Sequence, residues 1–386
     1  MKYLAILGRQ PEISIAELEA LFSDVKQISK SLATFNADSV DINRLGGSIK
    51  IAEKLNEKPL EFLQKAPDGK ITIGVSDYSK NASSRSAKTE ALKLKQILVR
   101  HGRSVRVVES HDKALSTATS LHNGLSGKND RKFELIKADN DWYRVVGVQD
   151  IDAYTKRDQA RPARDAKVGM LPPKLAQILI NLCGPLPANS RILDPFCGTG
   201  VVLQEALLMG YAAYGTDLSE RMVEYSLRNL KWFSDEHCDQ RGACAASPVT
   251  TGASVARSEE NPFKVSQGDA TSFHWEQPID AVACEGYLGA PMSNIPAEIK
   301  LKEQKQECSN IILGFLKNLA SQIGPDTPVV IATPAWLREN GTYSRLEIVD
   351  EIANMGYNVM NKSREGLLYH RDDQIVARDI IILRKK

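Results

Sequence analysis

The sequence predicts an α/β protein of two or three domains, with an open and mostly parallel sheet in its second half. The first observation is the stretch 191–217, RILDPFCGTGVVLQEALLMGYAAYGTD, whose pattern predicts a strand, a glycine-bearing turn, a helix and a second strand. The second is that apolar strands and amphipathic helices continue to alternate toward the C-terminus, which is typical of such a sheet. The third is the length of 386 residues, which exceeds one ordinary domain.

The turn in this stretch predicts a site for a nucleotide-like ligand. Glycines let the backbone approach such a ligand, and a carboxylate about 20 residues further on, here Asp217, can bind a ribose diol. The turn is not a dinucleotide fingerprint, because Leu203 stands where the third glycine would be, and no Gly-Lys-Ser/Thr phosphate loop follows. Asp194 would repel a pyrophosphate but would pair with the amino group of S-adenosylmethionine (SAM). An ordinary turn without a ligand is the alternative.

Composition and cysteine usage favour a cytoplasmic protein. Hydrophobic residues make up 42% and charged residues 25% of the chain. No apolar run approaches about 20 residues, so no membrane span is expected, and MKYLAILG predicts a first strand, not a signal peptide. Six scattered cysteines without a C-x-x-C pair favour a reducing compartment without disulfides or structural zinc. His237, Cys238 and Cys244 lie close in sequence, but we expect no metal there.

Charge is distributed unevenly along the chain. Residues 1–150 contain 24 Lys and Arg against 19 Asp and Glu, and residues 80–113 alone contain nine basic and three acidic residues. Such a local excess is the electrostatic pattern of a surface that binds phosphates. A solvated helix face without a partner is the alternative.

The first half is predicted to be a mixed α/β region. MKYLAILG predicts a strand, and a Gly-Arg-Gln-Pro turn leads into a helix with Ser14 as its N-terminal cap. The apolar face of this helix consists of Ile15, Leu18, Leu21 and Phe22. Short strands around a helix are predicted over 31–76, ending in the strand KITIGVSDY. The remaining predicted elements are a basic helix over 86–100, a strand SVRVVES, a helix over 117–125, and two closing strands, KFELIKAD and WYRVVGVQDIDAY.

The segment 154–174 predicts an exposed linker. YTKRDQARPARDAK has five basic residues and no apolar periodicity, so Arg157, Arg161 and Arg164 are expected to contact phosphates, and Tyr154 could stack on a base. GMLPPKLAQILINL then predicts an exposed Met-Leu-Pro-Pro and a helix with prolines in its first turn. The residues of this helix expected to face the sheet are Leu175, Ile178, Leu179 and Leu182.

The rest of the chain predicts a seven-stranded sheet. A helix over 220–233 precedes an irregular polar insertion over 234–262. The predicted elements that follow are a strand KVSQGDAT, a strand DAVACEGYLGAP, a helix over 304–323, a strand PVVIAT, a helix over 344–355 and a terminal hairpin around a polar turn of Arg371, Asp372, Asp373 and Gln374.

The motif DPFCGTG closely resembles the first motif of class I SAM-dependent methyltransferases, in the DP-x-CGTG version of RNA-modifying members. The chain apart from 234–262 resembles the THUMP-domain tRNA guanine-N2 methyltransferases of the archaeal and eukaryotic guanosine-10 type. The opening helix, SVRVVES, LSTATSLHNGL and the segment VQDIDAYTKRDQARPARDAKVGMLPPKLAQILINL carry the likeness. The domains it implies are a ferredoxin-like subdomain (1–60), a THUMP-like RNA-binding domain (61–154), a linker (155–174) and a Rossmann-like methyltransferase domain (175–386).

The resemblance also implies a cofactor site for SAM. Asp194 would bind the amino group and Asp217 the ribose diol, while Asp269 would accept from the adenine amine and Leu171 and Pro172 would lie near the methionine end. The full set of expected cofactor-binding residues is Leu171, Pro172, Asp194, Cys197, Gly198, Thr199, Gly200, Asp217, Leu218, Asp269 and Ala270.

The fourth strand departs from the family pattern. Methylases of exocyclic amines carry Asp or Asn, two prolines and an aromatic residue here, whereas this chain has Glu285, Gly286, Tyr287, Leu288 and Gly289. We expect Glu285 to orient the amine and Tyr287 to stack on the extruded base. The predicted function is methylation of a guanosine N2 amine in tRNA. The alternatives are a weak or inactive RNA-binding relative and a methylase of another base or of DNA. Whether a small activator protein is needed is left open.

Overall fold

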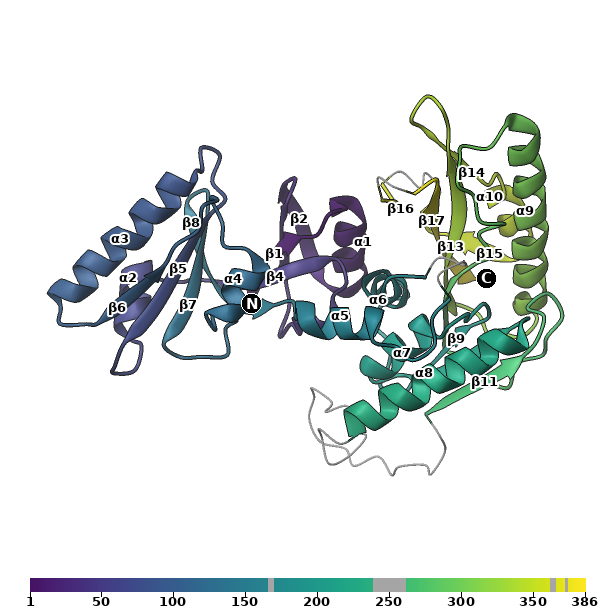
Figure 1. The fold of residues 1–386 in the computed structure, drawn as a ribbon, viewed down its shortest axis with the longest axis horizontal. Helices are drawn as coiled ribbons and strands as arrows, with labels where there is room; N and C mark the ends of the chain where they lie inside the picture. Colours follow the sequence, from purple (N-terminus) through teal and green to yellow (C-terminus); the bar gives the residue numbers. More distant parts are fainter. Residues whose placement is uncertain (166–169, 239–261, 362–365, 372–373) are drawn as a thin grey trace. The chain divides into compact units, whose positions relative to one another are not determined.

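The computed structural model describes residues 1–165, 170–238, 262–361, 366–371 and 374–386. The chain divides into two compact units, Met1–Thr155 and Lys156–Lys386, and each is described here by itself (Figure 1). Most of the expected insertion over 234–262 lies outside the described residues. The same holds for Cys244, and for Asp372 and Asp373 of the terminal turn.

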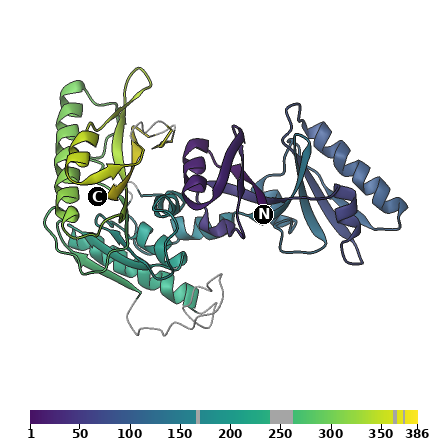
Figure 2. The same ribbon diagram turned by 180° about the vertical axis from the view of Figure 1, so that it is seen from behind.

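The first unit is built on one eight-stranded sheet, whose strand order is β2-β3-β1-β4-β8-β7-β5-β6. Its strands are β1 (Lys2–Leu7), β2 (Ser23–Ser29), β3 (Leu32–Asn36), β4 (Ser48–Lys54), β5 (Ile71–Asp77), β6 (Val105–Val108), β7 (Lys132–Ala138) and β8 (Asp141–Val148). Its helices are α1 (Pro11–Leu21), the 3-10 helix η1 (Ile42–Arg44), α2 (Pro59–Gln64), α3 (Ser84–Arg100), α4 (Thr117–His122) and the first part of α5 (Ile151–Gln159). The antiparallel pairing of β4 with β8 joins the predicted subdomains 1–60 and 61–154 into a single sheet, and α3 packs against β5 and β6 (Figures 1 and 2).

The start of α1 corrects the predicted cap. The helix begins at Pro11, whose fixed φ suits a first helical turn, and Ser14 lies inside the helix. The Ser14 hydroxyl donates to the carbonyl oxygens of Gln10 at 3.0 Å and Gly47 at 2.6 Å. The prediction that Ser14 caps the helix was therefore wrong, because this side chain ties α1 to a distant loop. In α3, by contrast, Ser83 caps the helix through a reciprocal pair of hydrogen bonds with Ser86.

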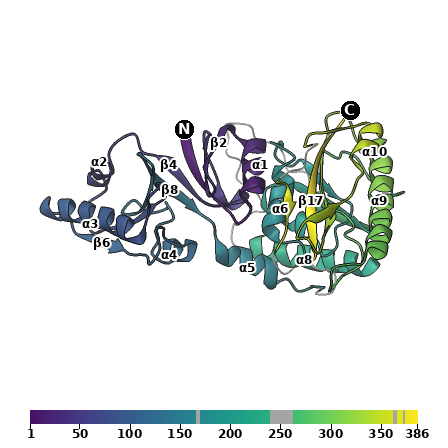
Figure 3. The same cartoon turned by 90° about the horizontal axis from the view of Figure 1, so that it is seen from above.

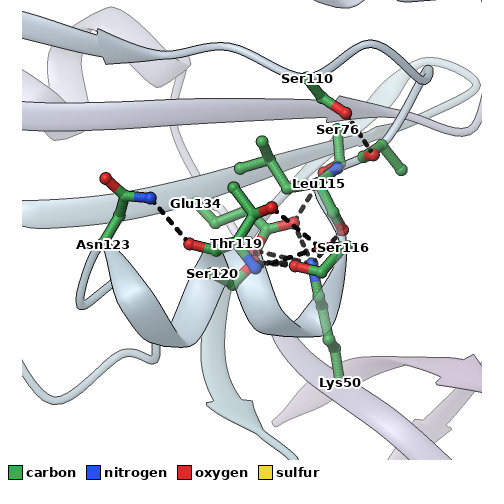
Figure 4. A network of polar contacts seen from close by, with 10 residues as sticks. Lys50, Ser76, Ser110, Leu115, Ser116, Thr119, Ser120, Asn123 and Glu134 are labelled. Atoms are coloured by element: carbon green, nitrogen blue, oxygen red, sulfur yellow. Dashed lines mark hydrogen bonds and ion pairs between the residues drawn. The ribbon is translucent and has the colours of Figure 1, made fainter.

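A buried polar network crosses the sheet of the first unit (Figure 4). The Nζ of Lys50 donates to both carboxylate oxygens of Glu134 at 2.7 and 2.9 Å, to the Leu115 carbonyl and to the Ser120 hydroxyl. Glu134 also accepts from the hydroxyls of Ser76 and Ser120 at 2.6 Å. Because every charged atom of the pair has partners, the charges are tolerated inside the protein. The network holds α4 against the sheet.

The segment predicted as an exposed linker is largely folded. Residues 151–159 form α5, and Tyr154, Arg157 and Arg161 are buried. Asn229 holds the following residues, since its side chain accepts from the Ala163 amide at 2.9 Å and donates to the Ala163 carbonyl. The predictions that Arg157 and Arg161 contact phosphates and that Tyr154 stacks on a base were therefore wrong, whereas Arg164 is exposed.

The second unit is built on a nine-stranded sheet, not the predicted seven. Seven strands form a continuous path, β11-β10-β9-β12-β13-β17-β15, and two short strands pair outside it, β14 with β13 and β16 with β17. The strands are β9 (Arg191–Asp194), β10 (Ala212–Asp217), β11 (Phe263–Gln267), β12 (Ala281–Glu285), β13 (Pro328–Leu337), β14 (Tyr343–Arg345), β15 (Tyr357–Val359), β16 (Leu368–Tyr369) and β17 (Val376–Lys385). Neighbours from β11 to β13 run parallel, and β17 is antiparallel to β13.

Helices cover both faces of this sheet. They are α6 (Pro173–Asn181), α7 (Val201–Leu208), α8 (Glu220–Cys238), α9 (Glu298–Ala320) and α10 (Val349–Asn354). The helices α6, α7 and α8 pack together on one face, and α9 and α10 pack together on the other (Figure 3). The helix predicted over 344–355 is instead β14 followed by α10, because residues 343–345 pair with the end of β13. No helix among the described residues is long and apolar enough to cross a membrane.

Candidate cofactor and active site

Four acidic residues lie at or just beyond the carboxyl ends of four adjacent parallel strands. Asp194 ends β9, Asp217 ends β10 and Glu285 ends β12, while Asp269 follows β11 by two residues. The strands are neighbours in the order β11, β10, β9 and β12, so all four ends lie at one edge of the sheet. In an open α/β sheet this edge is where ligands bind.

The glycine-bearing turn is hydrogen-bonded to the second acid. Gly198 and Gly200 have positive φ values of 51° and 82°, which glycine adopts without steric cost. The Gly198 amide donates to the Oδ2 of Asp217 at 2.9 Å, and the Ser219 amide donates to its Oδ1 at 2.9 Å. A carboxylate has about four acceptor positions, so Asp217 retains capacity for a ligand hydroxyl.

The two glycines have different neighbours. A Cβ atom on Gly198 would meet nothing nearer than the Phe196 carbonyl at 4.0 Å, so the turn is open on that side. A Cβ atom on Gly200 would lie 2.5 Å from the Ser226 hydroxyl of α8. The absence of a side chain on Gly200 therefore allows α8 to approach the turn.

Asp194 is a carboxylate with almost no solvent contact. It is 2% exposed, and its Oδ1 accepts from the Phe196 amide at 3.1 Å. Burial raises its pKa well above the usual value, and the charges of Asp217 and Glu285 raise it further. A cationic partner would stabilise the ionised form of this carboxyl group. The ammonium group of an amino acid is such a partner.

Two further expected residues, Cys197 and Thr199, lie in the turn itself. Cys197 is buried, burial raises its pKa, and its sulfur lies 3.7 Å from the Ser226 hydroxyl, so the thiol is a packing group. The Asn229 side chain donates to the Thr199 carbonyl at 2.8 Å. Among the described residues, the cysteines without a disulfide are Cys183, Cys197, Cys284 and Cys308.

The outer end of the candidate site fits an adenosine. Leu218, directly after Asp217, is 70% exposed, so it offers an apolar surface to a flat ring. The Oδ1 of Asp269 accepts from the amide and hydroxyl of Thr271 at 2.9 and 2.7 Å. Ala270 is buried, and its carbonyl accepts from Asn318 at 3.0 Å. The Gly268 amide, directly before Asp269, donates to the Asp217 carbonyl at 3.0 Å, so the chain around Asp269 is attached to the end of β10.

The segment before α6 lies differently from the prediction. Leu171 and Pro172 are buried in front of α6, not exposed as predicted. The NH1 group of Arg161 donates to the Thr199 hydroxyl at 3.2 Å, so a residue predicted to contact RNA lies at the glycine-bearing turn. No sequence signal links Arg161 to Thr199, because they are 38 residues apart.

Glu285 is held by a residue that sequence reasoning missed. Its Oε1 accepts from the Nε of Arg378, on β17, at 2.7 Å, and the NH1 of Arg378 donates to Gln374 at 3.1 Å. The side chains of Glu285 and Arg378 are 18% and 5% exposed. Glu285 therefore lies at the expected strand end as one half of a mostly buried ion pair.

Tyr287 is held against α9. Its hydroxyl donates to Glu307 at 3.1 Å, and its ring packs against the apolar core. Burial and the nearby Glu307 raise its pKa to about 12. Two residues further on, Gly289 has a φ of 84°, and the Gln304 side chain accepts from the Ala290 amide at 2.8 Å. The loop after β12 is thus tied to α9, and stacking of Tyr287 on a base stays a prediction.

A metal centre is not indicated by the described part of the chain. It contains no group of three or more His, Cys, Asp or Glu side chains that could hold a metal ion.

The chain is similar in sequence to known methyltransferases. Residues 161–307 match the UPF0020 family, described as RMKL-like, methyltransferase domain. The tRNA (guanine(10)-N2)-dimethyltransferase of Methanothermobacter thermautotrophicus is 29% identical over 182 residues, covering 47% of this chain and 44% of that protein. The enzyme of the same name from Methanocaldococcus jannaschii is 26% identical over 247 residues, covering 59% of this chain and 70% of that protein.

Among solved structures, the crystal structure of TrmN from Thermus thermophilus aligns over the whole of both chains, with 15% identity and a TM-score of 0.46. In the sequence comparison, the match to the M. thermautotrophicus protein spans less than half of that relative's length.

Proposed function

Because residues 161–307 match a methyltransferase domain, we propose that this chain is a SAM-dependent methyltransferase that modifies the exocyclic N2 amine of a guanosine in tRNA. One observation carries the proposal: four acids lie at neighbouring strand ends, at the same sheet edge as a glycine-bearing turn that is open at Gly198. The names of the two relatives support tRNA and guanine N2 as the substrate class.

The residues at the strand ends fit SAM by their chemistry. Asp194 offers a buried anion for the ammonium group, and Asp217 offers acceptor capacity for the ribose hydroxyls. Leu218 provides an exposed apolar surface for the adenine face, and Asp269 provides an acceptor for its amine. We infer that these four residues hold the cofactor.

The chemistry of the transfer requires alignment more than acid–base catalysis. SAM supplies a methyl group carried on a sulfonium sulfur. The lone pair of the guanine N2 atom is delocalised into the ring, so an acceptor must hold the amine hydrogens and direct the lone pair toward the methyl group. Glu285 can accept one N–H, and its ion pair with Arg378 fixes the position of the carboxylate before substrate binds. A proton released from the methylated nitrogen can pass to the carboxylate of Glu285 or to solvent.

RNA capture is proposed for the first unit. The basic helix α3 has Arg85 and Arg100 exposed and Lys95 partly exposed. Arg103, also in the basic segment, instead donates to the carbonyls of Ala66 and Pro67 at 2.9 and 2.7 Å. The phosphate-binding surface is therefore proposed to lie on α3, where positive charge without such partners attracts the RNA backbone.

A second candidate function is a weak or inactive RNA-binding relative. The ion pair of Glu285 with Arg378 and the hydrogen bond of Tyr287 to Glu307 favour it, because both expected catalytic side chains already have partners. The two candidates differ in turnover. Purified protein, bulk tRNA and methyl-labelled SAM should give label in the RNA under the first proposal. Binding of tRNA and SAM without label in the RNA would support the second, and label in DNA alone would point to a different substrate.

A further inference from the structure

Arg161 is a buried cation that forms no salt bridge among the described residues, although the charges of Asp158 and Glu205 act on it without direct contact. It is 3% exposed. Its NH1 donates to the Thr199 hydroxyl at 3.2 Å, its NH2 contacts the Met170 sulfur at 3.4 Å, and its Nε has no hydrogen-bond partner in the part of the chain that the structure describes. A thioether is a weak acceptor, so the guanidinium is poorly satisfied.

A neighbouring buried arginine, in contrast, has a direct ion pair. Arg157, four residues earlier, is also buried, and its Nε donates to Glu205 at 2.7 Å. Burial lowers the pKa of Arg161, which reflects the cost of holding its charge away from water. A buried charge is normally paired, and Arg161 lacks the direct ion pair that Arg157 makes with Glu205.

The location of Arg161 identifies the missing group. Thr199 lies in the glycine-bearing turn, between Gly198, which is open to a ligand, and Gly200. Asn229 holds this arrangement, because its side chain bonds to both Ala163 and the Thr199 carbonyl. The same turn starts at Asp194, the buried anion proposed for the ammonium of SAM. An amino-acid group carries an ammonium and a carboxylate on one carbon atom, so a site for it needs an anion and a cation close together.

We propose that Arg161 binds the carboxylate of the methionine moiety of SAM, through its Nε and a second N–H of the guanidinium. This inference rests on the proposed function, since it assigns a cofactor contact within the same site. The planar guanidinium matches a carboxylate with two parallel hydrogen bonds. Thr199 and Met170 hold the guanidinium in place by weaker contacts.

The test compares the affinities of two proteins for two ligands, measured by calorimetry. The ligands are S-adenosylhomocysteine and its decarboxylated analogue, S-adenosyl-3-thiopropylamine, which keeps the amine and loses only the carboxylate. The proteins are the full chain and Arg161→Gln. Wild-type protein should bind S-adenosylhomocysteine more tightly than the analogue by about 10- to 100-fold. Arg161→Gln should lose most of this preference while binding the analogue within about twofold of wild type.

Two further variants exclude a general disturbance. Arg164→Gln removes an exposed arginine three residues away and should leave the preference unchanged. Arg161→Lys keeps the charge without the planar fork and should retain an intermediate preference; it also serves if Arg161→Gln does not fold.

An equal loss of affinity for both ligands in the Arg161 variants would overturn the inference, as would no preference of the wild type for the carboxylate. Wild-type protein that binds neither ligand would overturn the inference together with the cofactor assignment. Normal cofactor binding without methyl transfer would overturn only the proposed reaction.

Discussion

The Oε1 of Glu285 accepts a hydrogen bond from the Nε of Arg378 at 2.7 Å, across 93 positions of the sequence. Arg378 lies on β17, which is antiparallel to β13, and β13 is the neighbour of the strand that ends at Glu285. The pair therefore spans three strands of one sheet. A glutamate reaches one methylene further than the aspartate usual at this position, and Arg378 restricts where that longer side chain can go.

We expect Glu285→Asp to lose turnover while cofactor affinity stays nearly constant. The shorter carboxylate cannot reach both Arg378 and the substrate amine, and a displacement of about 1 Å can lower a rate roughly a hundredfold. Single-turnover methylation of tRNA measures the rate, and calorimetry with S-adenosylhomocysteine measures cofactor affinity.

Variants of the surrounding residues are the controls. Arg378→Lys keeps the charge and should retain more activity than Arg378→Gln, because removing one partner of a mostly buried ion pair leaves the other charge unpaired. Tyr287→Phe should be tolerated, whereas Tyr287→Ala should slow turnover by removing a stacking partner worth about 1–3 kcal/mol. Turnover at the parental rate in both Glu285→Asp and Tyr287→Ala would contradict the catalytic assignment.

Asp194→Asn should stabilise the cofactor-free protein and abolish cofactor binding. Burial raises the folded-state pKa of Asp194 above its unfolded value. The folded protein therefore binds this proton more tightly than the unfolded chain, so stability falls as the pH rises from the unfolded pKa to the folded pKa. An asparagine removes that cost and can still accept from the Phe196 amide.

Melting temperatures measured without ligand between pH 5 and 8 test this. The variant should melt higher than wild type at pH 8, by about 2–4 °C per kcal/mol, and the difference should shrink as the pH falls through the raised pKa. Asp235→Asn, at an exposed position of α8, is the control and should leave the melting temperature unchanged. A variant that melts below wild type at pH 8 would disprove the assignment of a destabilising buried charge.

Alanine should mainly lower cofactor affinity at Gly198 and mainly lower stability at Gly200. Gly198→Ala places a Cβ in open space and adds only the backbone strain of its positive φ, so it should reduce affinity for S-adenosylhomocysteine more than stability. Gly200→Ala places a Cβ 2.5 Å from the Ser226 hydroxyl, and such overpacking costs about 1–3 kcal/mol in addition to backbone strain. Thermal melts and calorimetry on both variants measure the difference.

The double variant Gly200→Ala with Ser226→Ala should recover part of the lost stability, because the atom in closest contact is removed. If Gly200→Ala folds as stably as wild type and only Gly198→Ala is unstable, the assigned roles of the two glycines are reversed.

Binding of tRNA to the full chain should depend steeply on salt through α3. The variants Arg85→Gln, Lys95→Gln and Arg100→Gln should each reduce the slope of log affinity against log salt concentration by about 1. Lys26→Gln, at an exposed position of β2, is the matched control and should leave the slope unchanged. Filter binding at several salt concentrations measures it. Unchanged slopes for all three α3 variants would remove α3 from the RNA surface.

Local patterns in the sequence were sufficient to predict the backbone around the glycine-bearing turn. Asp194, Gly198 and Asp217 belong to one strand-turn-helix-strand unit, in which the order of residue types determines the backbone path, and the structure brings them together at one sheet edge. Elements with strong periodicity, such as α3, were predicted to within two residues of their observed bounds. Of the nine strands in the second sheet, β9 to β13 and the terminal pair β16 and β17 were predicted, whereas the short strands β14 and β15 were not.

Contacts between distant residues were not predictable in this way. Arg157 looked like an exposed charge because its neighbours are polar, yet it pairs with Glu205, 48 residues later. Ser14 has the residue type of a cap, but a proline upstream sets the start of the helix. The partner of Glu285 lies on the last strand of the chain. Each of these depends on tertiary packing, which a single sequence does not encode in any local period.

The most direct test of the account is the identity of the methylated nucleoside. Bulk tRNA is incubated with the protein and methyl-labelled SAM and digested to nucleosides, and the labelled product is identified by mass spectrometry. The account predicts label in N2-methylguanosine or N2,N2-dimethylguanosine, and its loss with Glu285→Ala. Label in any other nucleoside, or protein that binds tRNA and SAM without producing a labelled nucleoside, would contradict it.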